Sequence, residues 1–125
     1  MILGIGTDLM DMGRLSKESL SGEDPFAVRT FSKAELVSAG KTPDPYAYLA
    51  VRFAGKEAVF KALGRRIPHA AFNEIEILSD QNGAPFVNLY GYTKQAAMEM
   101  SVSRIHISLT YEKEYAAAFA VLEGE

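Results

Sequence analysis

Residues 44–64 read DPYAYLAVRFAGKEAVFKALG, and this stretch predicts the longest helix of the chain. Asp44 can accept a hydrogen bond as the N-cap residue. Pro45 suits the first helical position, where the N–H group that proline lacks would have no helical partner. Gly64 is typical of the residue that stops a helix. We therefore expect one long helix that runs to Leu63.

Two further helices are expected before this one. Ser32 and Glu35 fit a capping box, in which each side chain bonds the backbone N–H of the other, and that helix ends by Gly40. A first short helix is predicted from about Asp11 to Leu20, and a breaker segment that ends at Pro25 follows it.

The second half of the chain changes to an alternating pattern, which is typical of strands. Asn82-Gly83 is a hairpin signal, and Thr93 to Ser101 predicts one more helix. The five predicted strands cover residues 2–8, 74–77, 86–90, 104–110 and 115–122. Along the chain, one strand, three helices, two strands, one helix and two strands follow one another, and this order predicts an α+β fold with a mainly antiparallel sheet.

Composition limits the class of protein. The 125 residues suit a single domain, which we expect over residues 1–125, and the absence of cysteine excludes disulfides and thiolate metal sites. No charged leader and no run of about 18 apolar residues is present, so we expect a cytoplasmic protein without a membrane role. The net charge of −3 gives no electrostatic support for nucleic-acid binding. The cations are grouped, however, at positions 14, 17, 29 and 33 and at positions 52, 56, 61, 65 and 66.

The chemistry is expected on the long helix. Because an α-helix turns by about 100° per residue, Phe53, Glu57 and Lys61 lie on one stripe, with Gly64 near its end to admit a ligand close to the backbone. A carboxylate there can hold a divalent cation, and an ammonium group can neutralise a departing phosphate. Magnesium needs few carboxylates besides phosphate oxygens and water, and Asp8 is a candidate for the second one.

A simpler interpretation fits the same residues. Glu57 and Lys61 have the spacing and orientation of an ordinary surface ion pair, worth a few tenths of a kcal/mol. An aspartate after a strand, such as Asp8, is usually an N-cap residue. From the residues alone, both interpretations stay open.

Three segments, taken together, resemble the holo-acyl-carrier-protein synthases, the small trimeric members of the 4′-phosphopantetheinyl transferase superfamily. They are residues 4–9 (GIGTDL), residues 52–64 (RFAGKEAVFKALG) and residues 106–110 (HISLT), which lead into YAAA at 115–118. Arg14 stands at the spacing seen in the family, and the hairpin at 83–85 is also similar. The resemblance implies the family's α+β fold, with an antiparallel sheet and a long central helix.

The resemblance also implies an activity. Such enzymes transfer 4′-phosphopantetheine from coenzyme A to a serine of an apo acyl carrier protein, in fatty-acid biosynthesis, and release adenosine 3′,5′-bisphosphate. Carried over to this sequence, Asp8 and Glu57 would be ligands of Mg²⁺. Glu57, or a water that it orients, would take the serine proton, and Lys61 would stabilise the charge on the leaving group.

Further residues are implied as contacts of coenzyme A. Phe53, Lys61 and Gly64 belong to the helix motif, and the penultimate strand would contribute His106, Ser108 and Thr110. For His106 the alternative is a partly buried histidine bonded to backbone. For Ser108 and Thr110 it is an ordinary pair of polar sheet residues.

Arg52 lies about 140° around the helix from Glu57, so the two cannot serve one pocket within one subunit. In the family the active sites lie between neighbouring subunits of a homotrimer. Arg52 would then reach coenzyme A held by the next subunit, at its 3′-phosphate. The alternative is a solvated arginine on the back of the helix.

The acidic carrier protein is expected to dock at Arg14 and Lys17, although nearby acidic residues dilute this basic patch. We assign Tyr111 no role. Two competing hypotheses are a catalytically silent relative that only binds carrier protein or coenzyme A, and an unrelated α+β interaction domain. The joint presence of Asp8, Glu57 and Lys61 argues against the silent relative.

Overall fold

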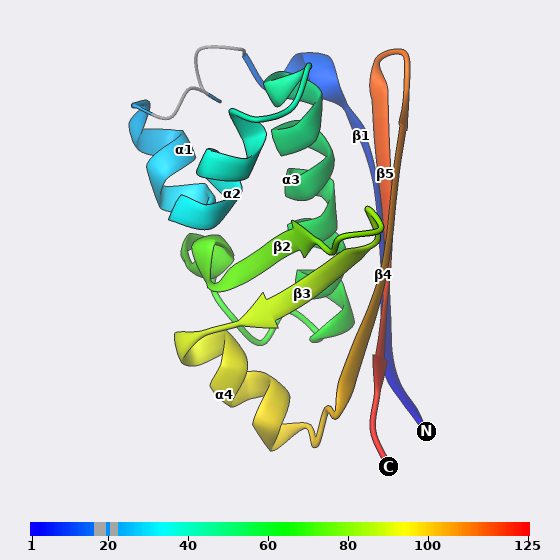
Figure 1. The fold of residues 1–125 in the computed structure, drawn as a ribbon. Coiled ribbons are helices and arrows are strands. Elements are labelled where there is room, and N and C mark those ends of the chain that lie inside the picture. The colour runs from blue at the N-terminus through cyan, green and yellow to red at the C-terminus, as the bar shows by residue number, and fades with distance from the viewer. Residues whose placement is uncertain (17–19, 21–22) are drawn as a thin grey trace.

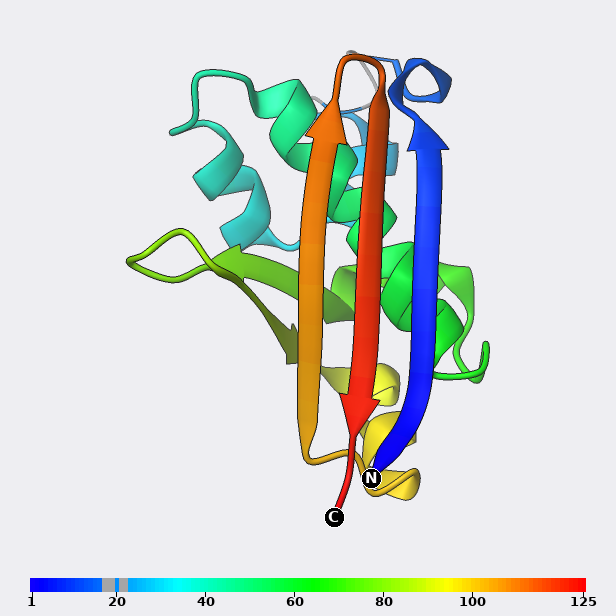
Figure 2. The same ribbon diagram turned by 90° about the vertical axis from the view of Figure 1, so that its right-hand side faces the viewer.

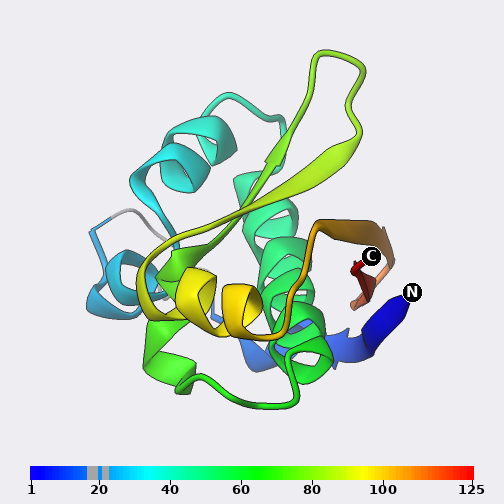
Figure 3. The ribbon, with the colours of Figure 1, turned by 90° about the horizontal axis from the view of Figure 1, so that it is seen from below.

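The computed structural model describes residues 1–16, 20 and 23–125. Its largest sheet has three antiparallel strands in the order β1-β5-β4, with β1 at Ile2–Asp11, β4 at Arg104–Glu112 and β5 at Tyr115–Glu123. Figure 1 shows this sheet edge-on with the rest of the chain on one face, and Figure 2 shows its open face. Both termini lie at one end of the sheet, where the Met1 ammonium donates to the Gly124 carbonyl at 2.7 Å (Figure 3).

The covered face of the sheet packs against α3, which runs over Pro45–Ala62. A two-stranded antiparallel hairpin, β2 at Ile75–Ser79 and β3 at Pro85–Leu89, lies on the same side of the sheet (Figure 1). The remaining elements are the α-helices at Pro25–Thr30 (α1), Lys33–Ala39 (α2) and Gly91–Glu99 (α4), and the 3₁₀ helices at Met12–Arg14 (η1) and His69–Glu74 (η2).

The α+β class and the antiparallel pairing are confirmed, as are the caps that the sequence predicts for α2 and α3. The Asp44 side chain accepts from the N–H of Ala47 at 3.1 Å, and Ser32 and Glu35 form both bonds of the capping box. α3 ends one residue before the predicted Leu63.

The predicted first helix is wrong in its described part. Asp11 accepts from the N–H of Gly13 and starts a single 3₁₀ turn, after which Leu15 is already extended. The helix that does form, α1, begins at Pro25, which we expected to act as a breaker. Asp24 accepts from the N–H of Phe26 at 2.8 Å and caps that helix, so the proline occupies its favoured first position.

The contact of α3 with β1 depends on two glycines. A Cβ atom added to Gly6 would lie 1.9 Å from the carbonyl oxygen of Ala58, and one added to Gly4 would lie 2.1 Å from that of Ala62. The backbone of the helix therefore rests directly on the backbone of the strand. The side chains that follow along β1 are held at a fixed distance from those on the helix.

A buried ion pair joins α3 to α2 and β2. Lys56 Nζ lies 2.8 Å from Glu35 Oε1 and donates to the carbonyls of Phe72, at 2.9 Å, and Ile75. Glu35 also accepts from the N–H of Ile77 at 2.8 Å, and both charged side chains are fully buried. Burial lowers the pKa of Lys56, although the Glu35 carboxylate favours the charged ammonium.

We expect Glu35→Gln to lower the free energy of unfolding by about 3–5 kcal/mol, because it leaves the Lys56 ammonium buried without a counter-charge. Urea denaturation followed by circular dichroism measures this loss. Glu99→Gln, on the exposed side of α4, is the matched control and should change stability by less than about 0.5 kcal/mol. The double variant with Lys56→Met should recover part of the loss. An unchanged unfolding midpoint in Glu35→Gln would contradict this account.

Candidate active site

A pocket lies where β1, η1 and α3 meet. Gly6, Asp8 and Met10 share the helix-facing side of β1 by strand alternation, so the Asp8 carboxylate points toward α3. The pocket has a volume of about 360 Å³ and is lined by Asp8, Leu9, Met10, Arg14, Leu15, Phe53 and Glu57. Two carboxylates that are 49 positions apart in the sequence therefore meet at one cavity.

Phe53 forms an aromatic wall of this pocket. Its ring centroid lies 6.0 Å from that of Phe26 in α1 and 6.0 Å from that of Phe72 in η2. These contacts hold the Phe53 ring in place, one helical turn before Glu57.

Lys61 lies beside the pocket and forms hydrogen bonds to two residues of β1. Its ammonium group is 3.3 Å from Asp8 Oδ1 and donates to the Thr7 carbonyl at 3.1 Å. Within the described residues, the ion pair of Lys61 is thus with Asp8 and not with Glu57. The surface pair suggested by the helical spacing is wrong, because the close approach at Gly6 brings a carboxylate of the strand nearer to the ammonium.

The carboxylates suit one kind of metal site. The described residues contain no group of three or more His, Cys, Asp or Glu side chains that could hold a metal ion by themselves. Asp8 and Glu57 together supply two carboxylates, and Mg²⁺ commonly uses one or two when phosphate oxygens and water complete its octahedral shell. The residues therefore fit a magnesium ion that is bound together with a phosphate-bearing ligand.

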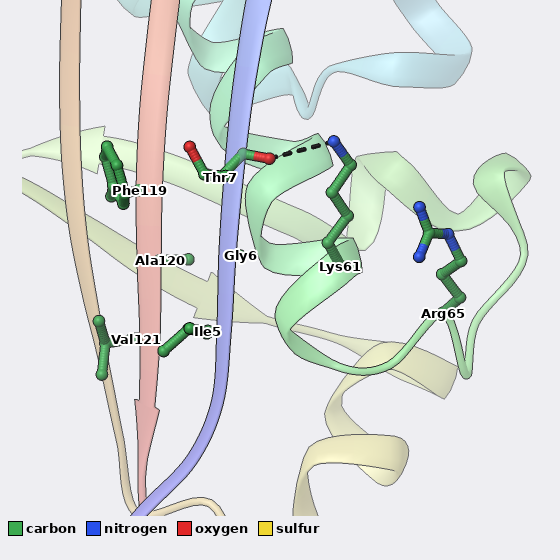
Figure 4. A pocket seen from close by; sticks show the side chains of 8 residues that line it. All are labelled: Ile5, Gly6, Thr7, Lys61, Arg65, Phe119, Ala120 and Val121. Atoms are coloured by element: carbon green, nitrogen blue, oxygen red, sulfur yellow. Dashed lines mark hydrogen bonds between the residues drawn. The ribbon is translucent and has the colours of Figure 1, made fainter.

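A second pocket, of about 640 Å³, is lined in part by Lys61. Its lining comes from β1, β5, the end of α3 and the loop after it, and comprises Ile5, Gly6, Thr7, Lys61, Arg65, Phe119, Ala120 and Val121 (Figure 4). Arg65 received no role from the sequence, although it belongs to the second group of cations. Gly64, which the sequence predicts to lie near a bound ligand, directly precedes it with a φ of 68°.

The other predicted contacts of coenzyme A lie at the opposite edge of the sheet. His106, Ser108 and Thr110 are exposed on β4. The His106 side chain is 52% exposed, with Nε2 2.8 Å from Glu123 Oε1, so the alternative of a partly buried histidine bonded to backbone is wrong. The hydrogen bond from His106 lowers the pKa of Glu123.

Arg52 is buried at this same edge, which rules out the solvated arginine. Its guanidinium group donates to the Ile77 carbonyl at 3.2 Å and to Ser79 Oγ at 2.7 Å, and lies 3.6 Å from the centre of the Tyr48 ring. Arg52 and Thr110 line one small pocket of about 180 Å³, together with Val51, Ser79, Gly83, Pro85, Leu109 and Tyr111.

The predicted residues thus form two groups in one chain. Asp8, Arg14, Phe53 and Glu57 share a pocket, with Lys61 bonded to Asp8 beside it. The second group comprises Arg52 and the exposed polar residues of β4. It lies at the opposite edge of the sheet from β1, because β5 separates β4 from β1. Lys17 lies outside the described residues.

Comparisons with known proteins agree with this fold. A family model described as ACPS, 4′-phosphopantetheinyl transferase superfamily, matches residues 4–120. A holo-acyl-carrier-protein synthase of Serratia proteamaculans is 40% identical over 124 residues, which are 98% of each chain.

Two solved structures are similar over nearly their whole length. The holo-acyl-carrier-protein synthase of Neisseria meningitidis has a TM-score of 0.84 and 35% identity, over 98% of this chain and 99% of that one. That of Helicobacter pylori, solved in complex with coenzyme A, has a TM-score of 0.79 and 26% identity, over 95% and 99%.

The fold is that of a group-transfer enzyme, as these relatives show. The chain belongs to the 4′-phosphopantetheinyl transferase superfamily, among the holo-acyl-carrier-protein synthases. No helix in the described residues is long and apolar enough to span a membrane.

We expect Gly6→Ala to destabilise the fold by about 1–3 kcal/mol, since the new methyl group would displace the backbone of α3 from β1. Thermal denaturation measures the loss. Gly40→Ala is the matched control, because its Cβ would meet no atom closer than 3.5 Å at a helical φ of −64°. Equal melting temperatures for the wild type and Gly6→Ala would show that the helix is not seated on the strand as described.

Proposed function

We propose that this chain transfers the 4′-phosphopantetheine group of coenzyme A to a serine of an apo acyl carrier protein, in fatty-acid biosynthesis, and releases adenosine 3′,5′-bisphosphate. One observation carries the proposal: Asp8 and Glu57 line one pocket with Lys61 bonded to Asp8, in a chain of the transferase family. The serine nucleophile belongs to the partner, so the chain needs no nucleophile of its own.

Asp8 and Glu57 would hold Mg²⁺, which supplies Lewis-acid polarisation of the phosphate when bound. Glu57, directly or through a water that it orients, accepts the proton of the attacking serine. Lys61 stabilises the negative charge that grows on the departing adenosine 3′,5′-bisphosphate. Its bond to the Thr7 carbonyl holds the ammonium against β1, and there it would meet the reacting phosphate.

The open face of the sheet supports a homotrimer in which the two groups of residues meet between subunits. Ile5, Leu9 and Phe119 are exposed there by 71%, 72% and 61%, a large apolar surface for a single chain. In such an assembly the β1 edge of one subunit faces the β4 edge of the next. Arg52 and Thr110, with His106 and Ser108, would then contact coenzyme A held by the neighbour, Arg52 at its 3′-phosphate.

The remaining parts of the proposal concern the partner and the setting. Arg14 is exposed at the rim of the Asp8–Glu57 pocket, where it would meet the acidic carrier protein, with Lys17 as a second docking residue. Residues 1–125 would act as a single transferase domain, in the cytoplasm.

The direct experiment incubates the protein with coenzyme A, Mg²⁺ and an apo carrier protein. The carrier should gain the mass of one phosphopantetheine group, and no gain with several carriers would rule out the activity. Glu57→Gln should keep the fold yet slow transfer by about 100-fold or more, since it loses both a metal ligand and a base. Glu99→Gln should transfer at the rate of the wild type. Normal transfer by Glu57→Gln would remove Glu57 from the mechanism.

A mixing experiment tests the shared site. Glu57→Gln impairs the Asp8–Glu57 pocket. Thr110→Glu places a carboxylate among the Arg52 and β4 residues, at an exposed position of the strand. Each variant alone should be nearly inactive. Random mixed trimers should regain about a quarter of wild-type activity, because one site in four combines two intact halves. No recovery after confirmed subunit exchange, or a wild-type monomer in sedimentation, would contradict the shared site.

A further inference from the structure

Arg65 has no part in the chemistry assigned so far, yet it lines the same 640 Å³ pocket as Lys61. Figure 4 shows both side chains on the same side of β1, projecting from the last turn of α3 and the loop just after it. The chain reverses here through two residues with positive φ, Gly64 at 68° and Arg65 at 57°. Hydrogen bonds from the N–H of Arg65 to the Phe60 carbonyl, at 3.1 Å, and from that of Gly64 to the Lys61 carbonyl, at 2.9 Å, hold this reversal against the helix.

The side chains of Lys61 and Arg65 differ in the partners that they already have within the chain. The Lys61 ammonium is bonded to the Asp8 carboxylate and the Thr7 carbonyl, so part of its charge is neutralised inside the chain. The guanidinium group of Arg65 is exposed and makes no ion pair or hydrogen bond with any residue that the structure describes. Arg65 is therefore the cation of this pocket whose charge is available to a ligand.

Arg66 provides an internal contrast. It is exposed, adjacent and equally charged, but it lines a different cavity, formed with Ile67, Pro68, Tyr92, Gln95, Ala96 and Glu99 around α4. Only Arg65 of this pair faces the pocket beside Lys61.

We propose that Arg65 is a substrate-binding residue that contacts the diphosphate group of coenzyme A next to Lys61. The inference rests on the proposed transferase function. A guanidinium group can donate two parallel hydrogen bonds to one phosphate, which suits an anion already bound on one side by an ammonium group. The diphosphate is the anionic part of coenzyme A nearest to Lys61 in the proposed mechanism, whereas the 3′-phosphate is assigned to Arg52 of the neighbouring subunit.

Calorimetric titration with coenzyme A and Mg²⁺, without carrier protein, tests the contact directly. Arg65→Ala should weaken binding by about three- to tenfold, as expected for a partly screened charge–phosphate contact. Dephospho-coenzyme A, which lacks the 3′-phosphate, should show the same loss. Arg65→Lys should recover part of the affinity, and the matched control Arg66→Ala should bind like the wild type.

In the transfer assay, Arg65→Ala should raise the KM for coenzyme A by the same factor, with kcat within about twofold and the KM for the carrier unchanged. Three results would overturn the inference: equal affinity of Arg65→Ala and the wild type, a loss that disappears with dephospho-coenzyme A, or a rise confined to the KM for the carrier. Binding that depends on Arg65 without any transfer would refute the proposed function alone. A wild type that does not bind coenzyme A would refute both.

Discussion

The backbone of α3 lies directly on the backbone of β1 at Gly4 and Gly6, and the candidate site depends on this contact. Any side chain at Gly6 would overlap the Ala58 carbonyl, so the helix could not approach the strand as it does. The approach places Asp8 two residues along the strand from Gly6, within 3.3 Å of Lys61. An ion pair is thereby built from residues 53 positions apart, without any loop to position them.

Two consecutive residues of α3 have opposite roles. Lys56 is fully buried and bonds Glu35 and two backbone carbonyls, which ties the helix to α2, η2 and β2. Glu57, about 100° further around the helix, faces the pocket with Asp8. Because a buried charged pair tolerates no loss of one partner, the rotation of α3 about its axis is strongly constrained. The direction in which Glu57 points follows from that constraint.

The sequence predicts the features of this protein that depend on neighbouring residues. The caps at Asp44 and Ser32 involve residues at most three positions apart, and both are present as predicted. Pro25 follows Asp24 as Pro45 follows Asp44, so the sequence carried the same start signal at both places, and the structure shows that it begins α1 as well as α3. Contacts between distant segments were not predictable from spacing. Lys61 pairs with Asp8 instead of Glu57, and Arg52 is buried against Ile77 and Ser79, because tertiary packing supplies closer partners than the helix does.

The net charge of −3 is a poor guide to what such a surface binds. Salt screens charges beyond about 8 Å at physiological ionic strength, so a bound phosphate responds mainly to the few groups beside it. Lys61 and Arg65 stand together at the end of α3, while Glu35 is buried with Lys56 and Glu123 pairs with His106 at the far edge of the sheet. Asp8 neutralises part of the Lys61 charge, so it is Arg65 that makes this end of an acidic chain locally basic. For the binding of a phosphate group, the position of each cation relative to the β1 edge matters more than the number of cations in the chain.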